Sequence, residues 1–225
     1  MEKKAFKIKF PPNFYWGSST SAYQVEGGNT NDWSEWEKEN AARLAKEALD
    51  KNYPDYVLND YPGPLRRDNY ISGRACDHYH RFAEDFDMAK TLGHNAHRFS
   101  IEWSRIEPEE GRFNTAEIEH YRKVIEALRG RGMEPFVTLW HFTNPIWIEK
   151  IGGWENKKTA QHFLNYSEKI VKEFKNDVKF WITINEPMVY AGNAYFRGIW
   201  PPQKKSLLKY IKVLKNLGSA HKKVY

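Results

Sequence analysis

The polar triplet Asn185-Glu186-Pro187 directly follows residues 180–184, whose sequence is Phe-Trp-Ile-Thr-Ile. A short run of β-branched and aromatic residues predicts a buried parallel strand. Pro187 is expected to end this strand, because proline has no N–H to donate to a sheet. Barrel enzymes hold their catalytic groups at the C-terminal ends of parallel strands. Glu186 is therefore a candidate general acid or base, rather than a solvated surface charge.

Polar side chains also accompany three earlier strand-like segments. Gln24 follows the first, Arg98 lies on the second and His141 follows the third. Because the C-terminal ends of parallel strands meet at one rim, we expect these side chains to gather near Asn185 and Glu186. Taken singly, a strand-end histidine or arginine is as often a structural residue as a functional one. Together they predict a site that binds several hydroxyl groups while an acid protonates a leaving oxygen.

The pattern of apolar residues alternates between strands and helices. The strand-like segments are residues 14–17, 96–101, 135–140 and 180–184, and amphipathic helices are expected over 77–92, 115–130, 158–174 and from 206 onward. Asp77 is expected to cap the first of these helices and Gly93 to end it. Such alternation predicts a parallel α/β sheet with right-handed crossovers. A long insertion at about 26–76, with a helix over 33–49, interrupts the pattern after the first strand.

Composition excludes several classes of function. The net charge of +6 is spread along the 225 residues, and no basic face is interleaved with aromatic residues, so nucleic-acid binding is not expected. Cys76 is the single cysteine, which rules out an internal disulfide and fits a reducing compartment. No metal-spaced His/Cys set is found, and we expect neither a metal nor a cofactor. No secretory signal or membrane span is seen, which predicts a cytoplasmic protein.

Three stretches together are similar to the successive motifs of glycoside hydrolase family 1. They are Phe-Tyr-Trp-Gly-Ser-Ser-Thr-Ser-Ala-Tyr-Gln-Val-Glu-Gly at 14–27, Arg-Phe-Ser-Ile-Glu-Trp-Ser-Arg at 98–105 and Thr-Ile-Asn-Glu-Pro at 183–187. His141 and the segment 152–154, Gly-Gly-Trp, also fall where this family has a histidine and a Gly-Gly-Trp element. The family includes β-glucosidases and β-galactosidases with a (βα)8 TIM barrel. The resemblance therefore implies a glycosidase barrel whose substrate is a β-glycoside.

The resemblance also assigns roles to residues of this chain. Glu186 would be the general acid/base, and Asn185 would bind the 2-hydroxyl of the sugar. Gln24 and His141 would bind the far hydroxyls of the same ring, and Arg98 would orient the nucleophile. Three aromatic residues are in places that could stack on the sugar: Trp140, Phe142 and Trp154.

The family's nucleophile lies in an Ile-Thr-Glu-Asn-Gly-like strand end, and the 225 residues contain no such stretch. If this chain held an unrecognised nucleophile, the candidates would be Glu26, Glu102 and Glu155. The resemblance implies that residues 1–225 are the N-terminal half of the barrel, with four βα units. The barrel would then be completed by a complementary C-terminal half-barrel chain, by a second copy, or by the rest of a longer chain. The alternatives are a non-catalytic sugar-binding half barrel and a folding fragment.

Overall fold

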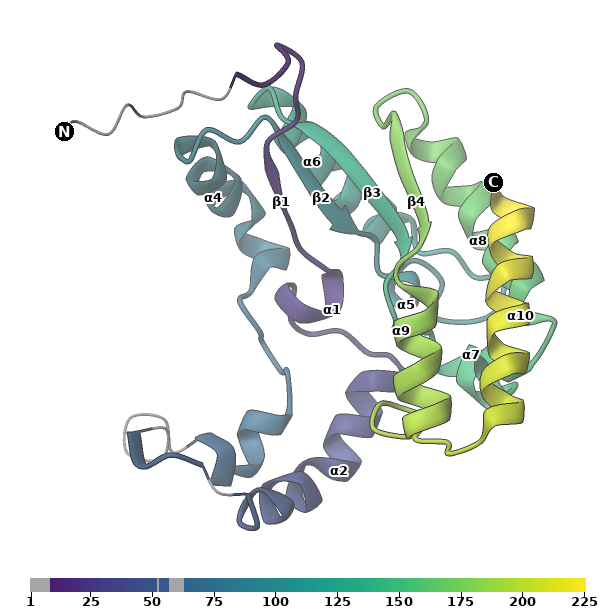
Figure 1. Cartoon of the computed structure of the whole chain (residues 1–225). Coiled ribbons are helices and arrows are strands. Elements are labelled where there is room, and N and C mark those ends of the chain that lie inside the picture. The colour runs from purple at the N-terminus through teal and green to yellow at the C-terminus, as the bar shows by residue number, and fades with distance from the viewer. Residues whose placement is uncertain (1–8, 52, 57–62) are drawn as a thin grey trace.

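The computed structural model describes residues 9–51, 53–56 and 63–225. Its sheet has four parallel strands in sequence order, β1 (Gly17–Ser19), β2 (Ala96–Ser100), β3 (Glu134–Trp140) and β4 (Phe180–Ile184) (Figure 1). This arrangement confirms the predicted parallel α/β sheet. The first strand was expected at 14–17 and begins later, because the backbone of Trp16 is held by the loop residue Asn95 through two hydrogen bonds of 2.6 and 2.9 Å.

The five long helices fall where the apolar periodicity predicted them. They are α2 (Asp32–Ala48), α4 (His78–Thr91), α6 (Thr115–Gly130), α8 (Thr159–Phe174) and α10 (Leu207–Val224). The last four are the crossover helices that follow the four strands, and α4, α6, α8 and α10 pack side by side in that order. The chain therefore supplies four successive βα units.

The cap predicted at Asp77 is wrong, although helix α4 does begin at the next residue. Asp77 adopts a left-handed backbone (φ 58), and its side chain makes no capping hydrogen bond. Its carboxylate accepts from Arg74 (2.6 Å) and from His80 (2.7 Å) instead. The expected stop is confirmed, because Gly93 takes up a positive φ of 83 just after the helix.

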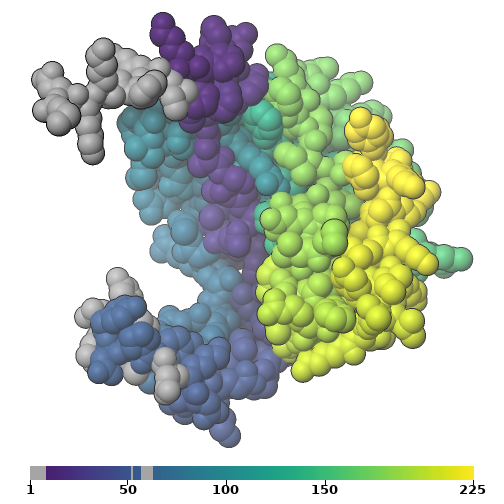
Figure 2. Space-filling view, in the orientation of Figure 1, coloured from purple at the N-terminus to yellow at the C-terminus, as the bar shows by residue number. Residues whose placement is uncertain are grey.

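Short helical segments, which the periodicity did not predict, cluster in the loops that follow the strands. They are α1 (Ala22–Val25), α5 (Trp103–Ile106), α7 (Ile146–Lys150), α9 (Pro187–Ala191), the 3-10 turns η1 (Gly63–Leu65), η2 (Arg67–Tyr70) and η3 (Gly153–Glu155), and the π-helix η4 (Gly192–Arg197). The insertion carries α2, η1 and η2. Figure 2 shows it as an arm at the lower left, with a hollow between it and the body of the molecule.

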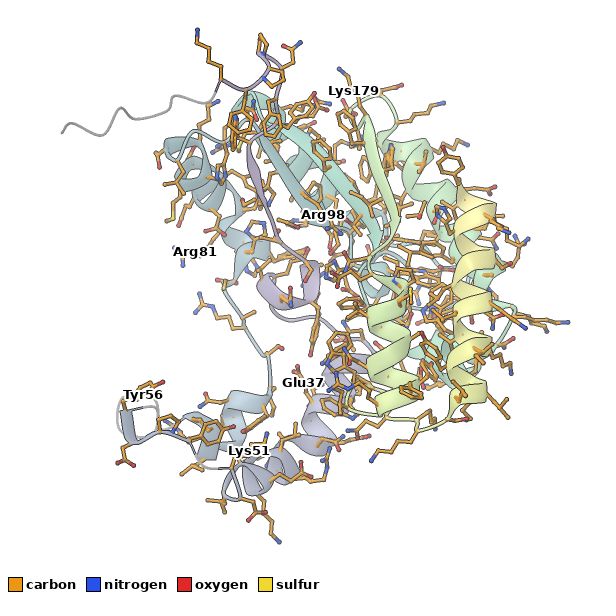
Figure 3. The ribbon with its side chains drawn as sticks, viewed as in Figure 1. Glu37, Lys51, Tyr56, Arg81, Arg98 and Lys179 are labelled. Atoms are coloured by element: carbon orange, nitrogen blue, oxygen red, sulfur yellow. The ribbon has the colours of Figure 1, made fainter. Side chains whose placement is uncertain are left out.

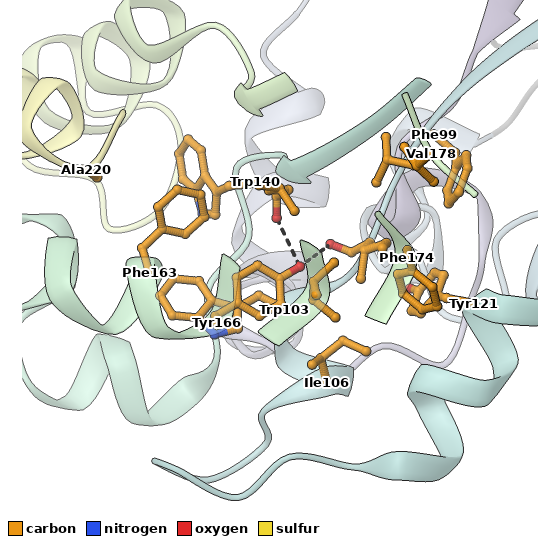
Figure 4. Close-up of a cluster of buried hydrophobic side chains, with 14 of the residues drawn as sticks. Phe99, Trp103, Ile106, Tyr121, Trp140, Phe163, Tyr166, Phe174, Val178 and Ala220 are labelled. Atoms are coloured by element: carbon orange, nitrogen blue, oxygen red, sulfur yellow. Dashed lines mark hydrogen bonds between the residues drawn. The ribbon is translucent and has the colours of Figure 1, made fainter. Parts of the chain in front are cut away.

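A core of buried aromatic and aliphatic side chains fixes the helices to one face of the sheet (Figure 4). Trp103 and Tyr166 stack with their rings 5.2 Å apart. The Tyr166 hydroxyl lies 3.3 Å from the carbonyl oxygen of Ile101 and 3.1 Å from that of Leu139. One tyrosine of α8 thus joins the C-terminal ends of β2 and β3, from which two of the site loops start.

The opposite face of the sheet is open. Arg98, Phe136 and Phe180 are register partners on adjacent strands and so project from one face. The rings of Phe136 and Phe180 stack 4.4 Å apart and remain partly exposed, whereas Phe99 and Val137 on the other face are buried. Within the described residues, β1 and β4 each pair with one neighbour only. The sheet is thus an open arc, with an interior face that no helix among the described residues covers.

Candidate active site

Glu186 lies at the C-terminal tip of β4, as the sequence predicted. Its backbone is left-handed (φ 41, ψ 59), a conformation that is strained for a residue with a side chain. Pro187 occupies the first turn of α9, where its missing N–H costs nothing. β4 ends at Ile184, and Pro187 is the first residue of the helix that follows. This strand-to-helix turn leaves the Glu186 carboxylate exposed at the rim.

Three of the predicted site residues meet beside Glu186. Arg98 Nη2 donates a hydrogen bond to Asn185 Oδ1, and Arg98 Nε donates to Thr138 Oγ1 at 2.9 Å. Asn185 Nδ2 lies 3.4 Å from His141 Nε2, and the Asn185 N–H donates to the carbonyl of Trp140 (3.0 Å). Side chains from β2, from the loop after β3 and from the tip of β4 therefore form one connected group. Figure 3 labels Arg98 over the open face of the sheet.

The histidine of this group is held neutral. Burial lowers the pKa of His141 to about 4, and the nearby charge of Arg98 acts in the same direction. If Nε2 accepts from Asn185, the ring proton must sit on Nδ1. Nδ1 is buried and has no hydrogen-bond partner within the part of the chain that the structure describes. His141 therefore holds one ring nitrogen whose hydrogen bond no described residue supplies.

Arg98 also interacts electrostatically with Glu186, the candidate acid. Burial lowers the pKa of Arg98, and the Glu186 carboxylate acts in the opposite direction. The guanidinium therefore lies within electrostatic range of Glu186 while it is hydrogen-bonded to Asn185. Such a charge at the rim can also hold a second carboxylate by charge-assisted hydrogen bonds.

Gln24 lies apart from this hydrogen-bonded group. It belongs to α1, its side chain is exposed, and its Oε1 accepts from Ser21 Oγ at 2.6 Å. Helix α1 is fixed to β2 because the Ala22 N–H donates to Ser100 Oγ (2.8 Å). Gln24 is thus placed on the same rim as Arg98, but no hydrogen bond links it to His141 or to Asn185 among the described residues.

Two of the three aromatic residues expected to contact sugar lie in the core instead. Trp140 is 1% exposed and Trp154 is 0% exposed, and their rings pack edge to face 5.2 Å apart. The Trp140 ring is also covered by Tyr190, 4.8 Å away, which comes from α9. Neither indole has a free face, so the expectation that Trp140 and Trp154 stack on a sugar is wrong.

Phe142 and two tryptophans that sequence reasoning missed form an aromatic group at the rim. Phe142 packs 5.1 Å from Trp200, and Trp200 packs 5.3 Å from Trp33. All three rings are partly exposed. Trp33 lies in the first turn of α2 and Trp200 precedes two prolines, so their separation in sequence gave no sign that they would meet.

The three glutamates considered as alternative nucleophiles are already engaged. Glu26 accepts from Arg105 (2.9 Å) and from the Tyr121 hydroxyl (2.7 Å), and it is buried. Glu102 is also buried and accepts from Thr143 and from other loop residues, and Glu155 forms an ion pair with Lys209 at 3.1 Å. These contacts give each of the three carboxylates a structural role.

Residues 9–51, 53–56 and 63–225 hold no cluster of three or more potential metal-ligating side chains. In the same residues, no helix is both long enough and apolar enough to cross a membrane.

Comparison with known proteins defines the class of protein and then the family. The solved structures most like this chain include a β-glycosidase from Pyrococcus horikoshii, with a TM-score of 0.81 and 38% identity, and a β-glucosidase from Thermotoga maritima in complex with castanospermine, with a TM-score of 0.77 and 32% identity. The alignments cover 98% and 96% of this chain, but 46% of each of those chains. The fold is thus the N-terminal half of a (βα)8 glycosidase barrel.

The family profile described as Glycosyl hydrolase family 1 matches residues 6–225, and the chain belongs to that family. Curated relatives include Beta-glucosidase A of Acetivibrio thermocellus, 36% identical over 96% of this chain, and Beta-glucosidase A of Thermotoga maritima, 35% identical over 95%. The chain spans about 45% of the length of the first and 44% of that of the second. The family and half-barrel predictions are both confirmed.

Proposed function

We propose that this chain supplies the general acid/base and part of the sugar site of an enzyme that hydrolyses β-O-glycosidic bonds with retention. The observation that carries the proposal is the joint placement of Glu186 and Asn185 at the tip of β4, with Arg98 and His141 in contact with Asn185. The names of the relatives, β-glucosidases and β-glycosidases, support the choice of substrate class.

The chemistry assigns a role to each residue at this tip. Glu186 protonates the leaving oxygen and afterwards activates a water molecule. A carboxylate from the second half of the barrel attacks the anomeric carbon, about 5–5.5 Å from the acid/base in a retaining enzyme. The positive charge of Arg98 holds that nucleophile ionised. Asn185, with one N–H left to donate, binds the 2-hydroxyl.

The remaining sugar contacts are assigned from the hydrogen-bond donors that lie at the rim. The neutral imidazole of His141 and the amide of Gln24 bind the far hydroxyls of the ring. Phe142 lines the site as an aromatic wall. Residues 1–225 act as one unit, with the insertion at 26–76 shaping the substrate mouth. A cytoplasmic location accords with the single, exposed Cys76.

Completion of the barrel requires a partner for the open edge of β4. A groove of about 480 Å³ runs between β4 and α10 and is lined by apolar residues such as Trp181, Ile184 and Leu217. Parallel strands are normally covered on both faces and paired on both edges. We propose that the strand added here comes from a complementary C-terminal half-barrel chain, from a second copy of this chain, or from the rest of a longer chain.

The test is reconstitution. This chain is mixed with the C-terminal half of a family member, such as the Pyrococcus horikoshii β-glycosidase, and a one-to-one complex is isolated by size exclusion. Hydrolysis of 4-nitrophenyl β-glucoside with initial release of the β-anomer, followed by NMR, is expected. The matched control is the same complex with Glu186→Gln, which keeps the size and removes the acid. A folded complex that is inactive, or that releases the α-anomer first, would refute the proposal.

A second candidate function is sugar binding without hydrolysis. It is favoured by one observation, the lack of any Ile-Thr-Glu-Asn-Gly-like stretch among the 225 residues. Calorimetry with glucose and cellobiose separates the two candidates. Saturable binding by a complex that does not turn over the aryl glucoside would support the binding protein and exclude the enzyme.

A further inference from the structure

The segment that carries His141 has an unfavourable backbone conformation. Phe142, the next residue, has a φ of 75, in the left-handed region that side chains other than glycine rarely adopt. Such a conformation is unfavourable and persists only where the surroundings hold it. The contacts that hold this turn therefore decide where the imidazole points.

Asp32 at the start of α2 provides the first of these contacts. Its Oδ1 accepts from the Asn144 N–H (2.8 Å) and its Oδ2 accepts from Asn144 Nδ2 (2.8 Å). The Asp32 N–H in turn donates to the Asn144 carbonyl (3.0 Å), and Asn144 Oδ1 accepts from Trp140 Nε1 (2.9 Å). Asn144 is 0% exposed and has all of these polar groups paired. It ties the residue before His141 to the insertion helix.

Glu102 provides the second contact, from the loop after β2. Its carboxylate accepts from Thr143 Oγ1, with 2.9 Å to Oε2 and 3.1 Å to Oε1. It also accepts from Asn31 Nδ2 (3.3 Å) and from Ser104 Oγ (2.7 Å). One carboxylate thus joins the loops that follow β1, β2 and β3.

Removing a carboxylate from water is unfavourable, so Asp32 and Glu102 are not the simplest way to stabilise a fold. Burial raises the pKa of Asp32 to about 8, so the surroundings disfavour the charged form, and the hydrogen bonds from Asn144 act in the opposite direction. What an apolar residue could not do is accept both donors of Asn144 in one geometry. The arrangement therefore favours a role in orientation over a role in stability alone.

We propose that Asp32 is a positioning residue for the sugar site, supported by Glu102. Through Asn144 and Thr143, the two carboxylates hold the turn at Phe142 so that the His141 ring keeps one orientation beside Asn185. Asp32 also couples the insertion to the site, because it is the first residue of α2. This inference rests on the proposed function for the identity of the substrate, but its geometric content does not.

The experiment exchanges the two side chains of the contact. In Asp32→Asn, the new amide N–H₂ must face either the side-chain N–H₂ or the backbone N–H of Asn144, and a hydrogen bond is lost. In the double variant Asp32→Asn/Asn144→Asp, the amide introduced at position 32 can accept from the backbone N–H of residue 144 and donate to the new carboxylate there. The backbone bond from residue 144 and the bond between the two side chains are then both restored, with the charge moved. The matched control is Asp50→Asn, an exposed aspartate outside the site.

In the reconstituted enzyme, Asp32→Asn should lower kcat/KM for 4-nitrophenyl β-glucoside by about 10²-fold, as expected for a misplacement of about 1 Å. The double variant should recover most of that loss, and Asp50→Asn should match the unmodified chain. A folded Asp32→Asn enzyme with unchanged kinetics would overturn the inference, as would a folded double variant that is no better than the single one. If Asp32→Asn does not fold, Thr143→Val, which removes the contact with Glu102, takes its place with the same expectation.

A second measurement does not depend on turnover. The imidazole ¹⁵N signals of His141 in this chain report which nitrogen is protonated and whether the ring has one orientation. Asp32→Asn should shift or broaden these signals, and the double variant should return them. Unchanged signals would overturn the positioning role. If the signals respond as expected while the unmodified complex hydrolyses nothing, then the proposed function fails and the positioning role stands.

Discussion

At the scale of single residues, the site combines a strained glutamate with polar partners that are already ordered. Glu186 is left-handed at φ 41, and strain of this kind is concentrated at functional positions. Asn185 is oriented without any ligand, because Arg98 fixes its oxygen and His141 lies beside its nitrogen. Binding energy is then not spent on ordering these groups.

The acid/base role of Glu186 predicts a dependence on the leaving group. In the reconstituted enzyme, Glu186→Gln should lower the hydrolysis of alkyl glycosides and disaccharides by about 10²–10⁴-fold, the usual range for loss of a general acid or base. Aryl glycosides with good leaving groups need little protonation and should lose less in the first step. Azide should restore part of the turnover, because it needs no base. Equal losses on both substrate types, without azide rescue, would contradict this role.

His141 and Asn185 should matter for the transition state more than for stability. We expect His141→Ala and Asn185→Ala each to lower kcat/KM by about 10–10³-fold, because hydrogen bonds to sugar hydroxyls that tighten in the transition state are lost. Thermal unfolding of each variant is measured beside its kinetics. A variant that mainly lowers the melting temperature, and leaves the kinetics alone, would show that its residue is structural.

At the scale of elements, apolar periodicity predicted the long helices but not the loops that shape the site. The helices over 115–130 and 158–174 have a continuous apolar stripe, and they occur where the pattern placed them. α9 has five residues, too few for a stripe to be read, and it covers the ring of Trp140. The burial of Trp140 was unpredictable because the residues that cover it come about 50 positions later.

The loop after β1 should give the chain a measurable pH dependence. Burial raises the pKa of Glu26 to about 7, although Arg105 and Tyr121 act in the opposite direction. The folded chain then holds a proton that the unfolded chain releases above its ordinary pKa of 4.5. This contribution to the free energy of unfolding is fully present below pH 4.5 and is lost as the pH rises through 7.

Glu26→Gln removes this proton equilibrium and should flatten the corresponding part of the stability curve. The free energy of unfolding of the unmodified chain, relative to that of Glu26→Gln, should fall by on the order of 3 kcal/mol over that range. Urea unfolding at several pH values measures the free energy of unfolding of both chains. The histidines titrate in both, so their contribution cancels when one free energy is subtracted from the other. Glu39→Gln, at an exposed position of α2, is the control. Parallel curves for the unmodified chain and Glu26→Gln would contradict the raised pKa.

At the scale of the whole molecule, the sheet has four strands of a barrel that its relatives build over about twice the length. Sequence motifs were sufficient to find the family and the order of the strands. They could not indicate how the interior face would look before closure, where Phe136 and Phe180 stack against each other and remain partly exposed. That face and the groove beside β4 expose apolar surface, so they are the surfaces where a partner is most expected to bind.

The 225-residue chain by itself should therefore associate, and it should hydrolyse β-glycosides only at trace level. Unpaired parallel edges and uncovered apolar surface favour pairing with another copy. A closed pair would place two Glu186 side chains across one mouth. It would bring no nucleophile, so at best it would have the spacing of about 6.5–9.5 Å that inverting enzymes use. Light scattering on each size-exclusion peak, followed by an aryl-glucoside assay, measures both properties. A stable monomer that hydrolyses the substrate with retention would show that this half of the barrel holds a nucleophile of its own.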